Sequence, residues 1–288
     1  MRGWMNEGKS YIPPVAIGEV MRAGGVGIVV ASKNSAFAVG DYVNAGLGVQ
    51  EYCLIPEDQI KRSGIFKIDL RAGSVTQWLN VLGMPGMTGY FGLMDVGQPK
   101  AGETVVVSGA AGAVGQTVGQ IAKLKGCRVV GIAGGAAKCD WVVRELGFDA
   151  CIDYKSGDLS ASLAIACPKG IDVYFDNVGG PTLDAVLNHM NAFSRIALCG
   201  QISGYNNPDV LAIRNVRSFL VNRIALRGFI CSDHMDLWRP ALKELGELVH
   251  DGKLRYRESI AIGLENAPGA FIGLLNGKNF GKQLVKLI

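Results

Sequence analysis

Residues 104–134 read TVVVSGAAGAVGQTVGQIAKLKGCRVVGIAG. Two β-branched runs, TVVVS and CRVVGIAG, flank a segment in which Val118 and Ile121 recur at helical spacing, and Gly126 stands where that helix should stop. Neither run alternates with polar residues, which is typical of a parallel strand buried on both faces. The stretch therefore predicts a strand–helix–strand unit with parallel strands.

The same alternation of apolar runs and helical segments continues to residue 231. We expect strands at residues 104–108, 127–134, 150–154, 172–178, 194–200 and 224–230. Strands that alternate with crossover helices form a parallel sheet that is covered on both faces. The predicted fold class is therefore α/β, with a Rossmann-type doubly wound parallel sheet.

The N-terminal part of the chain predicts a second, smaller β-rich domain. It is rich in glycine and contains strand-like runs at residues 26–32 and 51–56, separated by a turn cluster at 39–48. The predicted domain boundaries are residues 1–86 for this substrate domain, 87–231 for the nucleotide-binding domain, and 232–288 for a C-terminal return to the substrate domain.

The C-terminal return segment predicts two helices and a strand. Apolar residues recur at helical spacing over residues 236–253, and a second helical pattern covers 267–275. The chain closes on an apolar strand at 283–288.

The composition predicts a folded protein outside membranes. Of the 288 residues, 49% are hydrophobic and 19% charged, which suffices for a core and excludes disordered and collagen-like architectures. The 29 basic and 25 acidic residues are interspersed and leave a net charge of +4, so we expect no nucleic-acid partner. No apolar stretch approaches the ~20 residues of a membrane span, and the N-terminal residues lack a secretory signal. We expect a cytoplasmic protein.

Cysteine and histidine residues give no sign of a metal site or of disulfides. The seven cysteines include no Cys-x-x-Cys pair and stand mostly in apolar runs. The three histidines are scattered along the chain. We therefore expect reduced thiols and no metal.

A glycine-rich turn between the first predicted strand and its helix carries the clearest chemistry. Gly112 and Gly115 would let the backbone approach a diphosphate and let the helix pack closely on the sheet, while the helix N-terminus offers free N–H groups. The first glycine of the usual fingerprint is displaced, because residue 110 is Ala. A glycine-rich turn in a non-binding α/β fold is the alternative.

The residues after the second strand favour NADPH over NADH. A fold specific for NAD places an acidic side chain there, against the ribose hydroxyls. This chain has no carboxylate between Gly131 and Asp140, and it has Lys138, which would attract a 2′-phosphate. An ordinary solvated lysine at a helix start is the alternative for Lys138.

Several segments resemble one known family. They are GMPGMTGYFGL (83–93), residues 102–135, ELGFDACIDYK (145–155), DVYFDNVGG (172–180), RIALCGQISGYN (195–206) and GKNFGKQLVKL (277–287). Together they resemble the zinc-independent medium-chain dehydrogenases/reductases, in the branch of NADPH-dependent prostaglandin, alkenal and curcumin reductases. The resemblance runs over essentially the whole chain and implies a GroES-like small domain and a homodimer.

The resemblance also implies a set of site residues. The cofactor contacts it implies are Gly112, Ala113, Val114 and Gly115 at the diphosphate, Lys138 and Tyr154 at the 2′-phosphate, Asn177 after the fourth strand, Cys199, Gly200 and Tyr205 beside the nicotinamide, Phe229, Ile230 and Cys231 at its carboxamide, and Asn279 from the second domain. Each of these residues also has a purely structural alternative. Tyr154 could pack against the strands, Phe229 could be a core residue, and Asn177 and Asn279 could form turns.

The implied reaction is reduction of the carbon–carbon double bond of an α,β-unsaturated carbonyl compound, without metal. Hydride adds to the β carbon, and a proton is then added at the α carbon. Tyr205, a phenol in a polar loop after the fifth strand, is our candidate hydrogen-bond donor to the substrate carbonyl, although a surface loop would also accommodate it.

The chain opens at Met1 and Arg2, which match the tail of an Asp-Pro-Tyr-Met-Arg segment of the family. We therefore expect a GroES-like domain that is incomplete at its N-terminus. Two alternative functions stay open: a quinone oxidoreductase of the same superfamily, and a catalytically incomplete NADP-binding fragment. A zinc alcohol dehydrogenase is the least favoured.

Overall fold

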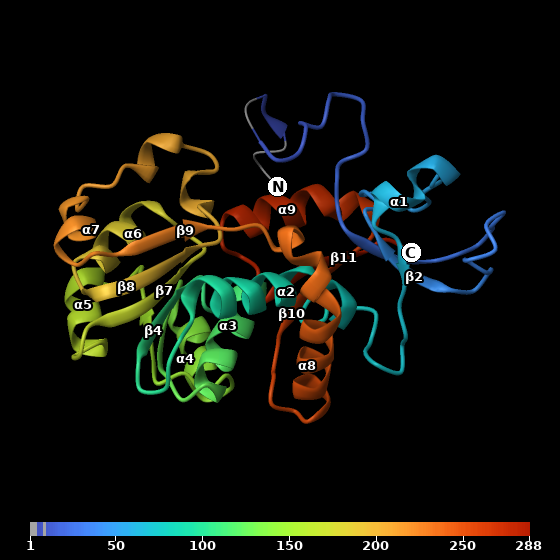
Figure 1. Cartoon of the computed structure of the whole chain (residues 1–288). Coiled ribbons are helices and arrows are strands. Elements are labelled where there is room, and N and C mark those ends of the chain that lie inside the picture. Colours follow the sequence, from blue (N-terminus) through green and yellow to red (C-terminus); the bar gives the residue numbers. More distant parts are fainter. Residues whose placement is uncertain (1–4, 8–9) are drawn as a thin grey trace.

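The computed structural model describes residues 5–7 and 10–288, so the match at Met1 and Arg2 lies outside the described residues. The chain forms a large lobe around a six-stranded sheet and a smaller lobe built from its N-terminal third. Figure 1 shows the two lobes at opposite ends of the molecule, with the C-terminal elements α9, β10 and β11 between them.

The sheet of the large lobe has the order β6-β5-β4-β7-β8-β9, and all of its strands are parallel. Its strands are β4 (Thr104–Ser108), β5 (Arg128–Ala133), β6 (Ala150–Asp153), β7 (Ile171–Asp176), β8 (Met190–Leu198) and β9 (Ala225–Gly228). Each coincides with one strand expected from the sequence. The strand order reverses between β4 and β7, and at such a point the connections diverge and leave a crevice at the carboxyl ends of the strands.

Helices cover both faces of this sheet, which confirms the doubly wound α/β fold. One face carries α2 (Met84–Phe91), its π-helical extension (Gly92–Gly97), α3 (Ala113–Leu124) and α4 (Ala136–Arg144). The other carries α5 (Leu159–Ala166) and α6 (Gly180–Leu187). In β4, Val105 and Val107 pack on the first face and Val106 on the second, so all three are fully buried. This two-sided burial explains the unbroken apolar run in the sequence.

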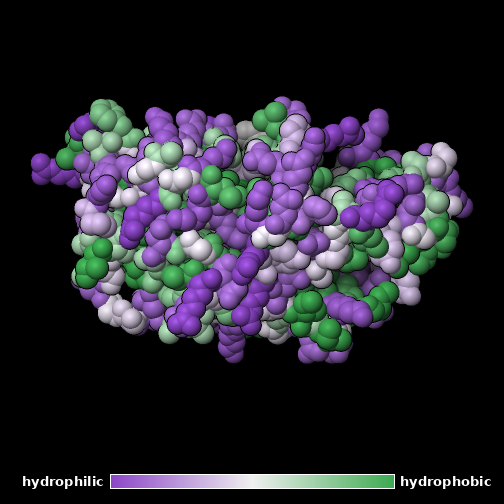
Figure 2. All heavy atoms as spheres, turned by 90° about the horizontal axis from the view of Figure 1, so that it is seen from below, coloured by the Kyte–Doolittle hydropathy of each residue, from purple (hydrophilic) through white to green (hydrophobic). Residues whose placement is uncertain are grey.

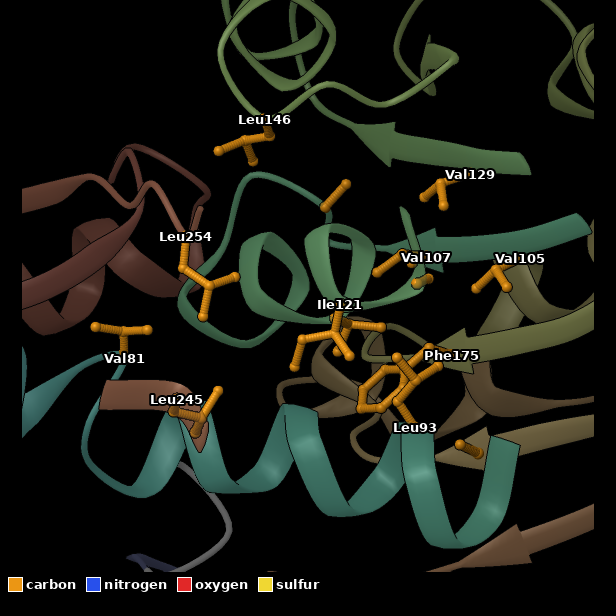
Figure 3. Close-up of a cluster of buried hydrophobic side chains, with 14 of the residues drawn as sticks. Val81, Leu93, Val105, Val107, Ile121, Val129, Leu146, Phe175, Leu245 and Leu254 are labelled. Carbon is orange, nitrogen blue, oxygen red and sulfur yellow. The ribbon is translucent and has the colours of Figure 1, made fainter. Parts of the chain in front are cut away.

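The core extends from the sheet into the C-terminal part of the chain. Figure 3 shows Ile121 of α3 among the sheet residues Val107 and Phe175, with Leu245 and Leu254 on the side away from the sheet. All five belong to one cluster of buried side chains. Because burying one such side chain contributes ~1.5–3 kcal/mol, this shared core ties the C-terminal segment to the large lobe.

The small lobe is a three-stranded antiparallel sheet of β1 (Gly25–Ile28), β2 (Tyr42–Ala45) and β3 (Phe66–Lys67), with the short helix α1 (Ile60–Ser63). The strand expected at residues 51–56 is wrong, and the expected turn cluster at 39–48 contains β2. The burial of side chains explains both errors. Val43 and Ala45 are buried, whereas Tyr52 and Leu54 are 68% and 89% exposed, so the run at 51–56 leaves these two side chains outside the core of the described residues.

The C-terminal segment contains α8 (Trp238–His250) and α9 (Ala267–Leu275), close to the two helices expected from the sequence, whereas α7 (Arg217–Val221) lies before this segment and was not expected. Its last strands, β10 (Glu258–Ile262) and β11 (Lys282–Lys286), pair with each other in a separate two-stranded parallel sheet. Short 3-10 helices span Glu57–Gln59, Gln77–Leu79, Ile202–Gly204, Pro208–Leu211, Cys231–Leu237 and Leu264–Asn266.

Two buried glutamines of α3 attach the C-terminal segment to the nucleotide-binding lobe. Gln120 donates to Arg255 O (2.7 Å) and accepts from Arg255 N (2.8 Å). Gln116 accepts from Arg257 N at 3.0 Å. The amides satisfy backbone groups that would otherwise be buried without partners.

Polar and apolar side chains are intermixed over the face seen in Figure 2, as expected from the interspersed charges of the sequence. Among the described residues, none of the helices has both the length and the apolar character that crossing a membrane requires. The seven cysteines are free thiols, of which Cys53 is exposed.

Candidate cofactor and active site

The glycine turn follows β4 at the point where the strand order reverses. Gly109 has φ +60°, a left-handed conformation that suits glycine, and it begins the turn one residue before the position of the usual first glycine. Ala110 fits because its methyl group is buried against Gly131. Gly115 has no room for a side chain, since a Cβ would lie 2.3 Å from Gly109 O. The displaced fingerprint of the sequence thus still produces a tight strand–helix turn.

No side chain caps the helix that follows this turn. Gly112 is the N-cap of α3, with extended backbone and no capping hydrogen bond. The first N–H groups of a helix lack intrahelical acceptors, and together with the helix dipole they favour an anion. Ala113, Val114 and Gly115 form the first turn of α3 after this cap. The geometry therefore fits a diphosphate at the place predicted from the sequence.

Asn177 fixes the entrance to the glycine turn. Its side-chain amide donates to Ser108 O (2.7 Å), and its backbone N–H donates to Ser108 Oγ (2.9 Å). Ser108 in turn donates to Asp176 Oδ1 at 3.1 Å. Burial raises the pKa of Asp176, while the backbone N–H groups of Gly179 and Val178 act in the opposite direction. The side chain of Asn177 therefore holds the ends of β4 and β7 together.

A cationic corner lies at the start of α4. A Cβ on Gly134 would be 2.9 Å from the Tyr154 ring and 3.1 Å from Lys155 Cε, so these two side chains cover the end of β5. The ring of Tyr154 is 50% exposed, and Lys155 Nζ lies 5.9 Å from its centroid. Burial, and then the charge of Lys155, lowers the pKa of Lys138.

Neither lysine of this corner forms an ion pair with an acid of the described chain, although the backbone N–H of Gly135 and, more weakly, the charge of Lys155 lower the pKa of Asp153. Lys138 Nζ donates to the backbone oxygen of Gly277 at 2.7 Å. The nearby Asp153 accepts the backbone N–H groups of Gly135 and Lys155 instead. Two like charges brought together in a partly buried corner favour an anion such as a phosphate. Lys155 is not among the residues predicted from the sequence, although its position directly after Tyr154 could have indicated it.

The predicted nicotinamide side is formed by the segment after β8. The backbone N–H groups of Cys199 and Gly200 donate to Asp176 O at 2.9 and 3.0 Å. A Cβ on Gly200 would lie 3.3 Å from Asn177 O and 3.7 Å from Tyr205 Oη, so the phenol reaches the ends of β7 and β8. Burial, and then the neighbouring Cys199, raises the pKa of Tyr205. The phenol therefore keeps its proton at neutral pH and can donate it.

Cys231 contacts helix α2. Its Sγ lies 3.3 Å from Thr88 Oγ1 and 2.8 Å from Met84 Sδ. Burial raises the pKa of Cys199 to about 12, and Cys231 adds to that shift. The two cysteines were predicted from the sequence, whereas Met84 and Thr88 were not, although both lie in the motif at 83–93. The hydroxyl of Thr88 donates to Met84 O at 2.7 Å, within α2.

The side chain of Phe229 faces the core. Its ring packs edge-on against Phe175, with centroids 6.0 Å apart, and it fills the space beside Gly92. Ile230 is half-buried, and its backbone oxygen accepts from Asp233 N at 3.0 Å. The Phe229 ring therefore packs in the core, and the contact predicted between the backbone of this segment and the carboxamide stays a prediction.

Asn279 approaches the glycine turn from the C-terminal segment. Its amide donates to Gly281 O at 2.7 Å. Gly281 N donates to Ala111 O at 3.0 Å, and Gly281 pairs with Gly112 in an isolated parallel bridge. Asn279 and the glycine turn are far apart in the sequence, but the contacts of Gly281 bring them close together.

The site offers anion-binding groups and neutral hydrogen-bond donors. The glycine turn and the cationic corner lie at successive strand ends, β4 and then β5 and β6, as a dinucleotide with a 2′-phosphate requires. The residues present therefore fit NADPH. Within the described ranges, no three His, Cys, Asp or Glu residues gather as metal ligands.

Two family models match the chain. The model described as zinc-binding dehydrogenase matches residues 113–247, and the one described as the N-terminal domain of oxidoreductase matches residues 1–63.

Curated proteins and solved structures are similar over nearly the whole chain. An NADPH-dependent curcumin reductase of Escherichia coli is 48% identical over 295 residues, covering 100% of this chain and 84% of the relative. A 2-alkenal reductase (NADP+-dependent) of Nicotiana tabacum is 43% identical, covering 96% and 80%. CurA from Vibrio vulnificus, crystallised with NADPH, superposes with a TM-score of 0.91 at 45% identity, covering 100% and 86%.

Proposed function

The chain belongs to the family of medium-chain dehydrogenases/reductases, and on that premise we propose that it reduces the carbon–carbon double bond of α,β-unsaturated carbonyl compounds with NADPH. The observation that carries the proposal is the placement of a protonated phenol, Tyr205, beside the strand ends that hold an uncapped glycine turn. The similarity to curcumin and alkenal reductases supports this substrate class.

The cofactor would be held by residues at three strand ends. The N–H groups of Ala113, Val114 and Gly115 would bind the diphosphate, and Lys138 with Lys155 would bind the 2′-phosphate beside Tyr154. When bound, NADPH supplies a hydride, a chemistry that protein side chains lack. The contacts proposed for Cys199, Gly200, Phe229, Ile230, Cys231 and Asn279 surround the remaining part of the cofactor.

Tyr205 would act on the substrate. Negative charge that develops on the substrate carbonyl oxygen requires a nearby hydrogen-bond donor, and a preorganised donor in a water-poor site is worth more than in bulk water. The raised pKa of Tyr205 keeps the phenol protonated. The phenol can therefore stabilise that oxygen.

We further propose that residues 87–231 bind the cofactor, and that residues 1–86 and 232–288 shape the substrate side. We also propose a homodimer. It is supported by β9, an edge strand whose four residues are all exposed and which presents unpaired backbone groups. Light scattering of the purified chain tests the oligomeric state, with twice the mass of one chain expected.

The function is tested by following NADPH oxidation at 340 nm, a general property of the reduced nicotinamide. The purified chain is mixed with 3-penten-2-one, with NADH replacing NADPH in a parallel assay. We expect turnover that depends on the enone and prefers NADPH. Turnover with a benzoquinone but not with the enone would instead identify a quinone oxidoreductase. Binding of NADPH without oxidation by either would identify an incomplete, non-catalytic chain.

A further inference from the structure

Residues 277–282, which we call the C-terminal strap, cross the cofactor-binding face of the large lobe. We propose that Phe280 is a positioning residue that holds this strap against α4 and thereby strengthens recognition of the 2′-phosphate by Lys138, without touching the cofactor itself. The inference rests on the proposed role of Lys138.

The backbone of the strap is joined directly to the glycine turn. Gly281 N donates to Ala111 O, and Gly281 pairs with Gly112 in a parallel bridge. Gly281 has φ +71°, and a Cβ there would collide with Arg257 O. The strap thus reaches the turn through a position where only glycine fits.

Phe280 is the side chain that anchors the strap. Its ring meets Trp141 of α4 edge-on, with centroids 5.1 Å apart and an interplanar angle of 82°. The guanidinium of Arg257 lies over this ring, 4.1 Å from its centroid. Ser259 Oγ accepts from Phe280 N and donates to Phe280 O, both at 2.9 Å. Ring and backbone of Phe280 are therefore fixed at once.

The anchor lies one helical turn from Lys138. Lys138 and Trp141 are three residues apart on α4, so their side chains share one face of the helix, and that face meets the strap. Lys138 Nζ donates to Gly277 O at the start of the strap. An ammonium has three N–H donors, so two remain for a phosphate while the third holds the group in place.

The expected consequence of removing Phe280 is selective. Without the ring, the strap is no longer held on Trp141, and although its backbone hydrogen bonds remain, the acceptor that limits the rotamers of Lys138 is fixed less firmly. The ordering of a long lysine side chain must then occur when the ligand binds, which weakens binding of the 2′-phosphate. Binding of a ligand that has no 2′-phosphate should be weakened less, because such a ligand does not use Lys138.

The test compares 2′,5′-ADP with 5′-AMP by calorimetry, since these two ligands differ in the 2′-phosphate and neither can react. Phe280→Ala and Phe280→Leu are measured, with Phe280→Tyr as the variant that retains the ring. Phe193→Ala is the matched control, because Phe193 also lies under a guanidinium, that of Arg223, but is 69% exposed and outside the site. Thermal unfolding of each variant shows whether it is folded.

We expect Phe280→Ala and Phe280→Leu to lower the preference for 2′,5′-ADP by about tenfold, with Phe280→Tyr and Phe193→Ala close to the unaltered chain. If Phe280→Leu folds and weakens binding of both ligands equally, or leaves the preference for 2′,5′-ADP unchanged, the role of Phe280 is overturned, while the assignment of Lys138 stands. If the unaltered chain showed no preference for 2′,5′-ADP, the assignment of Lys138 would fail, and the inference with it.

Discussion

Lys138 and Gly277 are joined by a hydrogen bond of 2.7 Å although 139 positions separate them in the chain. The bond links the start of α4, in the nucleotide-binding lobe, to the C-terminal segment. It lies beside Tyr154 and Lys155, in a corner where neither lysine forms an ion pair within the described chain.

The first prediction concerns the two lysines. Lys138→Gln and Lys155→Gln should each weaken NADPH binding by about 1.5–3 kcal/mol, the range for a hydrogen bond to a charged group, and should leave NADH binding nearly unchanged. Fluorescence titration of both cofactors measures this. Lys286→Gln, at an exposed lysine of β11, is the control. Equal losses for NADPH and NADH would contradict the 2′-phosphate assignment.

The second prediction concerns the glycine turn. A Cβ at residue 115 would lie 2.3 Å from Gly109 O, so Gly115→Ala must move α3 away from β4. We expect a loss of about 1–3 kcal/mol in the free energy of unfolding, together with a loss of NADPH binding. Chemical denaturation measures the first effect and titration the second.

Gly246→Ala is a matched control for Gly115→Ala. Gly246 lies within α8, and a Cβ there would meet nothing within 4 Å. Alanine at an open helical position should stabilise the chain by about 0.5–1 kcal/mol. Wild-type cofactor binding in Gly115→Ala would show that the turn does not hold the diphosphate.

Much of the cofactor half could be predicted from the sequence, because its signals are local. The apolar run of β4, the glycines of the turn and the period of α3 all lie within 31 consecutive residues, 104–134. Residues that depend on tertiary contacts could not be found this way. Lys155 lies near Lys138 only because β6 packs beside α4, and Thr88 contacts Cys231 only because α2 packs near it.

The small lobe was the least predictable part of the chain. The run at 51–56 has the residue types of a strand, but strand formation requires a partner and a buried face. The shorter segment Tyr42–Ala45 has both, because it pairs with β1 and β3 and buries Val43 and Ala45. The residue types alone do not distinguish the run at 51–56, which forms no strand, from the segment Tyr42–Ala45, which does.

The third prediction concerns Tyr205. Tyr205→Phe removes one donor from the site and should lower kcat by about 100-fold, while the KM for NADPH stays within about twofold. Tyr52→Phe, at an exposed tyrosine of the small lobe, should change neither. Steady-state kinetics separate the two constants. A wild-type kcat in Tyr205→Phe would exclude the phenol as the donor.

The pH dependence gives a fourth prediction. Burial raises the pKa of Tyr205 above its usual value near 10, so the donor is protonated throughout the neutral range. Activity that depends on this proton should stay level to about pH 10 and fall only above it. Tyr205→Phe should lose this alkaline fall. A decline already between pH 7 and 9 in the unaltered chain would require a different group.

The fifth prediction concerns the thiols. Cys53 is exposed, whereas burial raises the pKa of Cys199 to about 12, which leaves almost no thiolate at pH 7. N-ethylmaleimide should therefore modify Cys53 first in the native chain, and Cys53→Ser should remove the fast adduct. Peptide mass spectrometry locates the adducts. Faster labelling of Cys199 or Cys231 than of Cys53 would contradict this prediction, because it would show that these thiols are accessible to the reagent and ionised.

The central claim is the reduction of a carbon–carbon double bond, and the identity of the product tests it most directly. The unaltered chain is incubated with NADPH and 3-penten-2-one, and the product is identified by gas chromatography with mass spectrometry. We expect 2-pentanone, in which the double bond is saturated and the carbonyl is retained. Formation of 3-penten-2-ol, in which the carbonyl is reduced and the double bond remains, would contradict the proposed function.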